Sequence, residues 1–266
     1  MLRSVRELHG YTIHAIDGEI GKLRDFYFHD EAWIIRYLAV GMGRWLPERK
    51  VLISTSALLG GPNGAGHTLP MALTQRQVER SPEIDADKPV TREQELLLHL
   101  HYGWPLYWSE PTVNGWQRST SPEPVLASVA TSRSPLRKPV VSQLRSARPV
   151  RGYLVMAGDG ELGHVEDLIV DDVSWIIRYL MVYTGRVLPA RKVLISPQWL
   201  WKINYDENQV NVTLTREKIL QCPEFHNGTG LNREYEEKLY SYYGQSAYWQ
   251  NPVPESAGTK VPVIFL

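Results

Sequence analysis

Short runs of alternating apolar and polar residues predict β-strands in the first part of the chain. One strand is predicted over Tyr11–Ile16, and Asp17-Gly18 then forms a tight hairpin turn, because glycine tolerates a positive φ. The return strand is predicted over Lys22–Phe28. Two further runs, Lys50–Ser54 and Thr68–Leu73, extend this set of short strands.

The segment Trp33–Val40 gives the clearest strand, since aromatic and β-branched side chains dominate it. Regular alternation would place Trp33, Ile35 and Tyr37 on one face. The opposite face is also largely apolar, so this strand is predicted to be central in its sheet. Short antiparallel strands with regular turns indicate a small β-barrel, because closure removes exposed strand edges.

Helices are predicted after the strands. Thr74–Arg80 begins with a threonine N-cap and ends before a proline. Thr91–Tyr102 also begins with threonine and carries Leu96, Leu97 and Leu100 at helical spacing. The predicted fold class is therefore mainly β with accessory helices.

The whole pattern occurs twice. Ser4–Leu58 aligns without a gap on Ser146–Leu200, at an offset of 142 residues. The later part aligns at an offset of 141, and the predicted helix Thr91–Tyr102 corresponds to Asn232–Tyr243. A repeat of this length is the size of a domain, so the sequence predicts two homologous domains rather than an array of small units.

Four segments follow from this alignment. Residues 1–112 form the first repeat with its helical extension, and residues 146–252 form the second. Residues 113–145 are rich in serine, proline and arginine, which is typical of a linker. Residues 253–266 form a tail with an apolar end, and we expect such a tail to be docked on a surface.

Charge is distributed unevenly over these segments. The chain of 266 residues has 29 basic and 29 acidic side chains, which excludes a strongly basic nucleic-acid binder as a whole. Residues 113–150 nevertheless hold six basic residues and one acidic residue. The predicted linker is therefore a basic tether between two mildly acidic repeats.

Cysteine content and apolar run length bear on location. Cys222 is the single cysteine, which excludes an internal disulfide bond and any cysteine-based metal cluster. No apolar run approaches the roughly 20 residues of a membrane-spanning helix, and the N-terminal residues do not resemble a signal peptide. We therefore expect a cytoplasmic protein without an integral membrane segment.

The order of motifs resembles the PRC-barrel family, which is named for the cytoplasmic domain of the photosynthetic reaction centre H subunit. The motifs that carry the resemblance recur in both repeats, and in the first they are Gly10-Tyr11, Asp17-Gly18, Gly21 with Asp25, Trp33–Val40 and Arg49–Ser54. The chain thus resembles two PRC-barrels in tandem, over about residues 4–75 and 146–216.

This resemblance implies two small antiparallel β-barrels, no catalysis and no cofactor. The ribosome maturation factor M family contains the same type of domain. The H subunit has a membrane helix and the ribosome factor has an RNA-related domain, and neither is expected here. The specific roles of these relatives are therefore not carried over.

Three groups of side chains are candidate sites. Arginine on an apolar strand needs a partner, so structural ion pairs are expected between Arg36 and Asp25 and between Arg178 and Asp167. Basic strand edges that could contact phosphate or block aggregation comprise Arg44, Arg49, Lys50, Arg186, Arg191 and Lys192. Candidates for protein interaction at the aromatic ends, or for internal packing there, are Trp104, Tyr107, Trp108, Tyr243, Tyr248 and Trp249.

Catalytic and metal-binding residues are not predicted. Cys222 has no base that the sequence can place beside it. His99 and His101 are two residues apart and do not share a helix face. The carboxylates of Asp17 and its neighbours are explained by hairpin turns.

The sequence therefore predicts a non-enzymatic protein-interaction or assembly module with an unidentified protein partner or a second copy of itself. Two alternatives remain open at this stage. One is an RNA- or ribosome-associated factor, indicated by the basic linker. The other is a peripheral partner of membrane electron-transfer machinery, by analogy with the H subunit.

Overall fold

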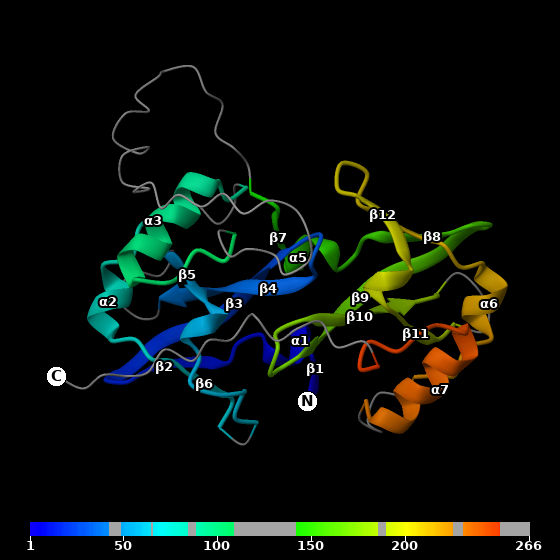
Figure 1. Ribbon diagram of the computed structural model, residues 1–266, viewed down its shortest axis with the longest axis horizontal. Helices are drawn as coiled ribbons and strands as arrows, with labels where there is room; N and C mark the ends of the chain where they lie inside the picture. Colours follow the sequence, from blue (N-terminus) through cyan, green and yellow to red (C-terminus); the bar gives the residue numbers. More distant parts are fainter. Residues whose placement is uncertain are drawn as a thin grey trace, which may run out of the picture.

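A computed structural model describes residues 1–42, 49–64, 66–84, 89–108, 142–185, 190–225 and 231–250. The chain forms two β-sheets that lie next to each other, each flanked by its own helices (Figure 1). The predicted class, mainly β with accessory helices, is confirmed.

The elements recur in the same order in both halves. The first half contains β1 (Leu2–Ser4), α1 (Val5–Leu8), β2 (Thr12–Ala15), β3 (Gly18–His29), β4 (Ile34–Met42), β5 (Lys50–Ser54), β6 (Thr68–Pro70), α2 (Gln75–Glu79) and α3 (Arg92–Tyr102). The second half contains β7 (Leu144–Ser146), α5 (Ala147–Val150), β8 (Leu154–Ala157), β9 (Gly160–Asp171), β10 (Ile177–Tyr183), β11 (Lys192–Ile195), β12 (Leu200–Asn204), β13 (Gln209–Val212), α6 (Arg216–Leu220) and α7 (Arg233–Tyr243). Short 3-10 helices cover Thr55–Ala57 and Pro197–Trp199.

Strand order is equivalent in the two sheets. It is β5-β4-β3-β2-β6 in the first and β11-β10-β9-β8-β13-β12 in the second. Among the described residues, the end strands of each path do not pair with each other, so closure into a barrel stays a prediction. As predicted, β4 is central, and its residues from Ile35 to Val40 are buried apart from the half-buried Arg36.

The two halves exchange their first strands. β1 pairs with β9 of the second sheet, and β7 pairs with β3 of the first sheet. The register is equivalent at both places, with Leu2 opposite Asp171 and Leu144 opposite His29. We call β1–α1 and β7–α5 the exchanged arms. Leu144 and Arg145, which the sequence assigned to the linker, are therefore part of a sheet strand.

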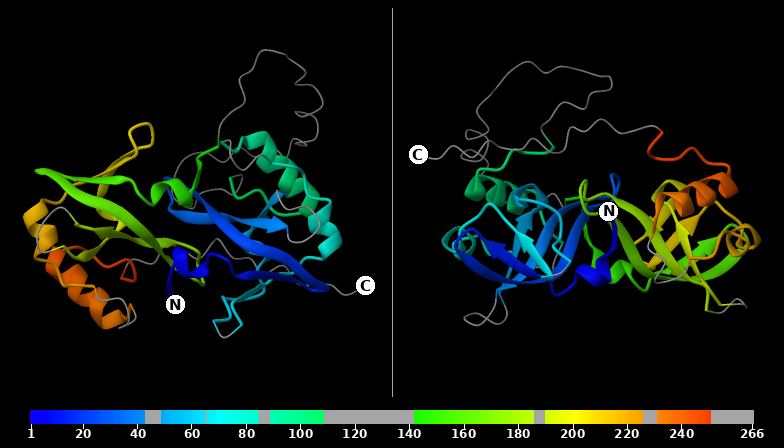
Figure 2. Two further views of the ribbon diagram at one scale, coloured as in Figure 1. Left: turned by 180° about the vertical axis from the view of Figure 1, so that it is seen from behind. Right: turned by 90° about the horizontal axis from the view of Figure 1, so that it is seen from below.

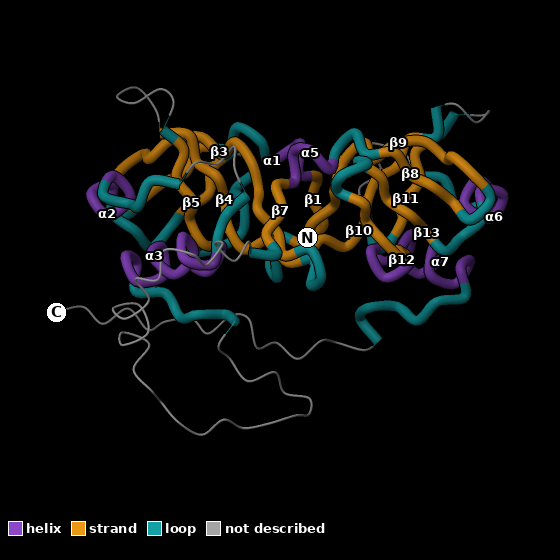
Figure 3. Tube along the Cα trace, turned by 90° about the horizontal axis from the view of Figure 1, so that it is seen from above, coloured by secondary structure: helices purple, strands orange, loops and turns teal. Residues whose placement is uncertain are grey.

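The arms meet at the centre of the molecule. Figure 3 shows α1 and α5 side by side between the two sheets, with α2 and α6 at opposite outer ends. The right-hand view of Figure 2 shows the same arrangement from the opposite side. The molecule thus resembles a symmetric dimer whose two subunits are joined in one chain.

Trp33 and Trp175 form the centre of this junction. Both have φ of 56°, in the left-handed region that tryptophan rarely adopts. The Trp175 carbonyl accepts from the Ile35 amide at 2.8 Å, and the Trp33 carbonyl accepts from the Ile177 amide at 2.7 Å. The left-handed turn ends the predicted strand one residue early and directs each carbonyl to the other half.

A β-bulge in each half changes the predicted faces of the central strand. Tyr27 pairs with Tyr37 and Phe28 with Ile35, so Arg36 is the extra residue of the pairing. Ile35 consequently lies in the large core and Tyr37 in a separate cluster on the other face. Their predicted placement on one face is therefore wrong.

The predicted helix starts are confirmed, but one predicted face is not. Thr74 and Thr91 both form capping boxes at the starts of α2 and α3. On α3 the buried residues include Leu98, whereas Leu97 and Leu100 are 54% and 59% exposed. The hairpin turn also lies one residue earlier than predicted, since Ala15 pairs with Gly18 and Asp17 stands inside the turn.

Several predicted features lie outside the described residues. They are Arg44, Arg186, residues 113–141 of the linker and residues 253–266 of the tail. Within the described ranges, no helix combines the length and apolar character needed to cross a membrane.

Candidate functional site

The aromatic end of the first half surrounds one buried carboxylate. Glu95 is fully buried on α3 and accepts hydrogen bonds from the Tyr37 hydroxyl at 3.1 Å and the Tyr107 hydroxyl at 2.5 Å. Arg92, one turn earlier, places a guanidinium nitrogen 3.1 Å from the same carboxylate. The Tyr37 hydroxyl also contacts His99 Nε2 at 2.7 Å.

The second half repeats this arrangement. Glu236 accepts from the hydroxyls of Tyr179 and Tyr248, both at 2.8 Å, and pairs with Arg233 at 3.2 Å. Tyr240 stands where the first half has His99. We call these sets the Glu95 cluster and the Glu236 cluster. Their repetition indicates that they hold each helix and aromatic end against its sheet.

Burial sets the protonation of these groups. Burial first, and then the negative charge of the neighbouring glutamate, raise the pKa values of Tyr37, Tyr107 and Tyr248 above the usual tyrosine range. These tyrosines therefore stay protonated and act as donors. Burial also lowers the pKa of His99, which favours its neutral form.

The bulge arginines lie over the same tyrosines. The Arg36 guanidinium is 4.2 Å from the centre of the Tyr107 ring, and that of Arg178 is 4.0 Å from the Tyr248 ring. The bulge explains why arginine is accommodated in an otherwise apolar strand, since the extra residue is turned away from regular pairing.

The predicted interaction residues at the aromatic ends have intramolecular partners. Trp104 stacks on Tyr102 with ring centres 4.2 Å apart, and the buried Tyr243 lies 4.5 Å from Trp199. Trp108 and Trp249 lie under Arg92 and Arg233, at 4.5 and 4.0 Å. These contacts support the internal-packing alternative for all six candidates, including Tyr107 and Tyr248.

The predicted pairs Arg36–Asp25 and Arg178–Asp167 are not formed. Arg178 instead pairs with Asp171 at 3.5 Å. Asp25 accepts from the Ser146 hydroxyl at 2.5 Å and from the amide of Arg148 at 3.2 Å, both in the exchanged arm of the other half.

Asp167 has the equivalent role in the second half. It accepts from the Ser4 hydroxyl and from the Arg6 amide of the first arm. Ion pairs reinforce each arm, with Arg3 2.7 Å from Asp172 and Arg145 3.0 Å from Asp30. The sequence suggested these aspartates as internal partners of strand arginines, whereas in the structure they join the halves.

Two of the basic-edge candidates close the ends of short helices. Arg49 donates to the carbonyls of Glu79 and Ser81, both at 2.7 Å, just after α2. Arg191 donates to the carbonyls of Leu220 and Cys222 after α6. The last carbonyls of a helix have no partner within it, and a cation there also complements the helix dipole. These arginines therefore satisfy backbone groups of their own half.

Replacing Arg49 with methionine is expected to lower the free energy of unfolding by about 2 kcal/mol, because two charge-assisted hydrogen bonds are lost. Arg49→Lys should also destabilise, since an ammonium group does not reproduce the planar fork. Urea unfolding of the full chain measures both effects. Arg76→Met on the exposed face of α2 is the matched control, with an expected change below about 0.5 kcal/mol. Equal stability of the Arg49 and Arg76 variants would contradict the capping role.

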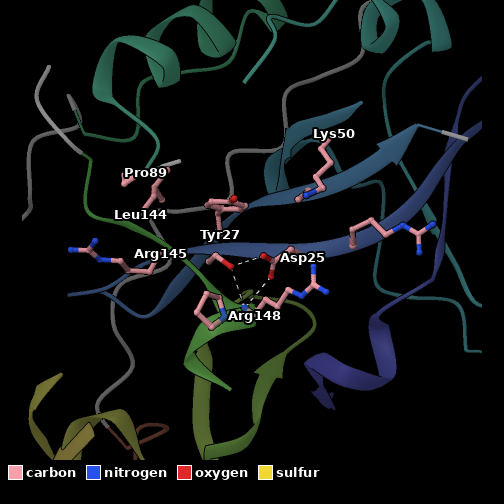
Figure 4. Close-up of a pocket in the computed structure, with 11 residues that line it drawn as sticks. Asp25, Tyr27, Lys50, Pro89, Leu144, Arg145 and Arg148 are labelled. Atoms are coloured by element: carbon pink, nitrogen blue, oxygen red, sulfur yellow. Dashed lines mark hydrogen bonds between the residues drawn. The ribbon is translucent and has the colours of Figure 1, made fainter. Parts of the chain in front are cut away.

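The remaining basic-edge candidates differ between the halves. Lys192 pairs with Glu166 at 2.8 Å. Its counterpart Lys50 lines a pocket beside Asp25 and the second exchanged arm, shown in Figure 4. The wall of this pocket includes Arg24, at the position that Glu166 occupies in the second half.

The polar residues considered for catalysis have structural contacts. Asp17 accepts from the Gln75 amide at 2.8 Å and so holds the start of α2. His101 Nε2 is 2.8 Å from the Gln77 carbonyl. Cys222 is buried, and burial raises the pKa of its thiol. Within the described part of the chain, no three His, Cys, Asp or Glu side chains gather as a metal site would require.

The sequence interpretation missed Glu95 and Glu236. A signal was present, because each glutamate follows an arginine by three residues at equivalent positions of the two repeats. It was overlooked because a glutamate on a helix is usually solvent-exposed.

Known proteins do not extend these observations. A comparison of the chain with protein-family models finds no matching family, and a comparison with curated proteins finds no matching relative. The geometry of this chain is therefore the basis on which its function is argued.

Proposed function

We propose that the chain is a non-enzymatic protein-interaction or assembly module of the cytoplasm, built from two PRC-barrel-like halves. The duplicated fold supports this proposal, because the buried Glu95 and Glu236 clusters recur in both halves with the same structural contacts. The buried Cys222 thiol is compatible with a reducing compartment.

The observation that carries the proposal is an apolar surface on α3. Leu97 and Leu100 are more than half exposed, and we call them the α3 patch. The equivalent positions on α7 are Lys238, which pairs with Glu234 at 2.7 Å, and Ser241. One helix is thus adapted to water and its counterpart carries exposed leucines, which is typical of a surface that contacts another protein.

The partner expected here is a protein that offers an apolar surface. The flanking residues Glu93 and His101 are exposed and would contribute a polar rim. The patch is present once per chain, so one partner is expected for each molecule.

Exchanging the patch for the α7 residues tests this function. The double variant Leu97→Lys, Leu100→Ser is expected to fold normally and to lose its partner in crosslinking and affinity purification, because the apolar contact is removed. Leu59→Ser, at another leucine that is 58% exposed, is the matched control and should retain the partner. Sedimentation velocity of the same three proteins shows whether the partner is a second copy.

Recovery of the same proteins with the double variant as with the control would contradict the proposal. Recovery of RNA instead, lost at high salt, would favour the RNA-associated alternative. Recovery in the membrane fraction would favour the electron-transfer alternative.

A further inference from the structure

The pocket beside Asp25 is formed where the second exchanged arm crosses the first sheet. Its volume is about 340 Å³, and its lining residues come from β3, β4, β5, the residue before Val90 and the β7–α5 arm. This volume is in the lower part of the range of about 300–1,000 Å³ found for small-molecule sites. The wall is partly apolar and includes Tyr27, Pro89 and Leu144.

Positive charge dominates the polar part of the wall. Figure 4 shows Lys50 and Arg148 on either side of Asp25, whereas Arg145 extends away from it. Arg145 is 3.0 Å from Asp30 and so is already paired. The third cation of the wall is Arg24, an exposed side chain on β3.

Asp25 does not cancel these charges. One of its carboxylate oxygens accepts from the Ser146 hydroxyl, and the other accepts from the amides of Phe26 and Arg148. Both oxygens are thus committed to holding the arm. Three cationic side chains and one carboxylate leave the wall with a net positive charge.

The second half provides an internal comparison. Arg24 and Glu166 are both the extra residue of a β-bulge, opposite Val40 and Ala39 in one half and Met181 and Val182 in the other. Glu166 lies 2.8 Å from Lys192 and 3.7 Å from Arg6, which are the counterparts of Lys50 and Arg148. The second half therefore neutralises the same two cations with a built-in carboxylate.

Gly41 makes room for the exchange of charge at this position. A Cβ atom on Gly41 would stand 3.1 Å from Cγ and Nε of Arg24. The counterpart of Gly41 is Tyr183, which lies at the end of β10. Arg24 thus runs across a strand residue that has no side chain, next to Lys50, which pairs with Gly41.

We propose that this pocket binds a phosphate monoester with a compact organic part. The dianion would occupy the place that the Glu166 carboxylate takes in the second half, between Arg24, Lys50 and Arg148. Arginine suits this role because its planar fork binds phosphate oxygens in pairs. The organic part would contact Tyr27, Pro89 and Leu144. This site is separate from the α3 patch and does not rest on the proposed protein partner.

Phenyl phosphate is the probe of this site, and titration calorimetry of the full chain measures its binding. One equivalent is expected to bind, and Arg24→Glu should weaken binding about 30-fold or more, because one charge-assisted contact is lost and a repulsive charge is added. Arg24→Gln should give a smaller loss. Arg76→Met is the control for removing an exposed positive charge elsewhere and should bind as the parent does. Equal affinity of the parent and Arg24→Glu overturns the proposal.

The reciprocal variant tests the role of Glu166. Glu166→Arg releases Lys192 and Arg6 and is expected to add a second, weaker equivalent of phenyl phosphate. Unchanged stoichiometry in Glu166→Arg would count against the electrostatic argument.

Two further arms identify the source of the phosphate. Phosphatidylcholine vesicles that contain phosphatidic acid should be bound, and displaced by phenyl phosphate, if the monoester is a lipid headgroup. Absence of vesicle binding with retained phenyl phosphate binding identifies a soluble monoester. Tight binding of a single-stranded RNA oligonucleotide, without binding of phenyl phosphate, overturns the proposal in favour of a phosphodiester ligand.

Discussion

Replacing Glu236 with leucine is expected to lower the free energy of unfolding by about 3 kcal/mol, one of the largest single-residue effects in the molecule. The variant would leave the hydroxyls of Tyr179 and Tyr248 without their acceptor. Tyr179 is fully buried, so water does not replace the lost bond. Arg233 is half exposed and would be solvated, which keeps the loss below that of a fully buried ion pair.

Glu236→Gln is the matched control, because the amide oxygen still accepts a hydrogen bond and the shape is nearly unchanged. Its expected cost is about 1 kcal/mol. Glu95→Leu should cost less than Glu236→Leu, since Tyr37 keeps the contact with His99 that Tyr179 lacks. Urea unfolding followed by fluorescence provides these values. A leucine variant as stable as the glutamine variant would show that the cluster does not anchor α7. If Glu236→Leu does not fold, Tyr179→Phe removes the donor instead, with an expected loss of about 1 kcal/mol.

The repeat explains how much of the fold the sequence could predict. Capping residues such as Thr91 and strands such as Lys50–Ser54 are local signals, and the structure has them at the predicted positions. The faces of Trp33–Val40 could not be predicted, because the bulge at Arg36 interrupts the alternation. A bulge depends on the pairing with β3, which the segment itself does not encode.

The exchange of the arms could not be predicted either. β1 has only three residues, and its backbone hydrogen bonds could be satisfied equally well by its own sheet or the other one. What selects the other half is the set of contacts at its end, including Asp167 with Ser4 and Arg3 with Asp172. These residues are more than 160 positions apart in the sequence. The candidate site was similarly hidden, because Arg24 gains its meaning only from comparison with Glu166 across the two halves.

Cleaving the chain in the predicted linker is expected to leave the two halves bound to each other. Each half supplies a strand to the sheet of the other, and the buried side chains of Leu8 and Val150 lie on the exchanged arms. A protease site inserted among residues 119–138 gives the test, since size-exclusion chromatography of the cleaved protein should recover one complex with both fragments. Separation of the fragments under native conditions would contradict the exchange.

The aspartates that hold the arms should control the strength of this complex. Asp25→Ala with Asp167→Ala removes the acceptors for both arms, and about 1.5 kcal/mol for each site corresponds to a roughly 100-fold weaker association of the cleaved halves. Asp17→Ala with Asp159→Ala is the matched control, because these carboxylates accept from the Gln75 and Arg216 amides within their own halves. The control should destabilise each half but change the dissociation constant by less than about threefold. If both pairs of substitutions weaken association equally, the junction depends on general stability rather than on the arm contacts.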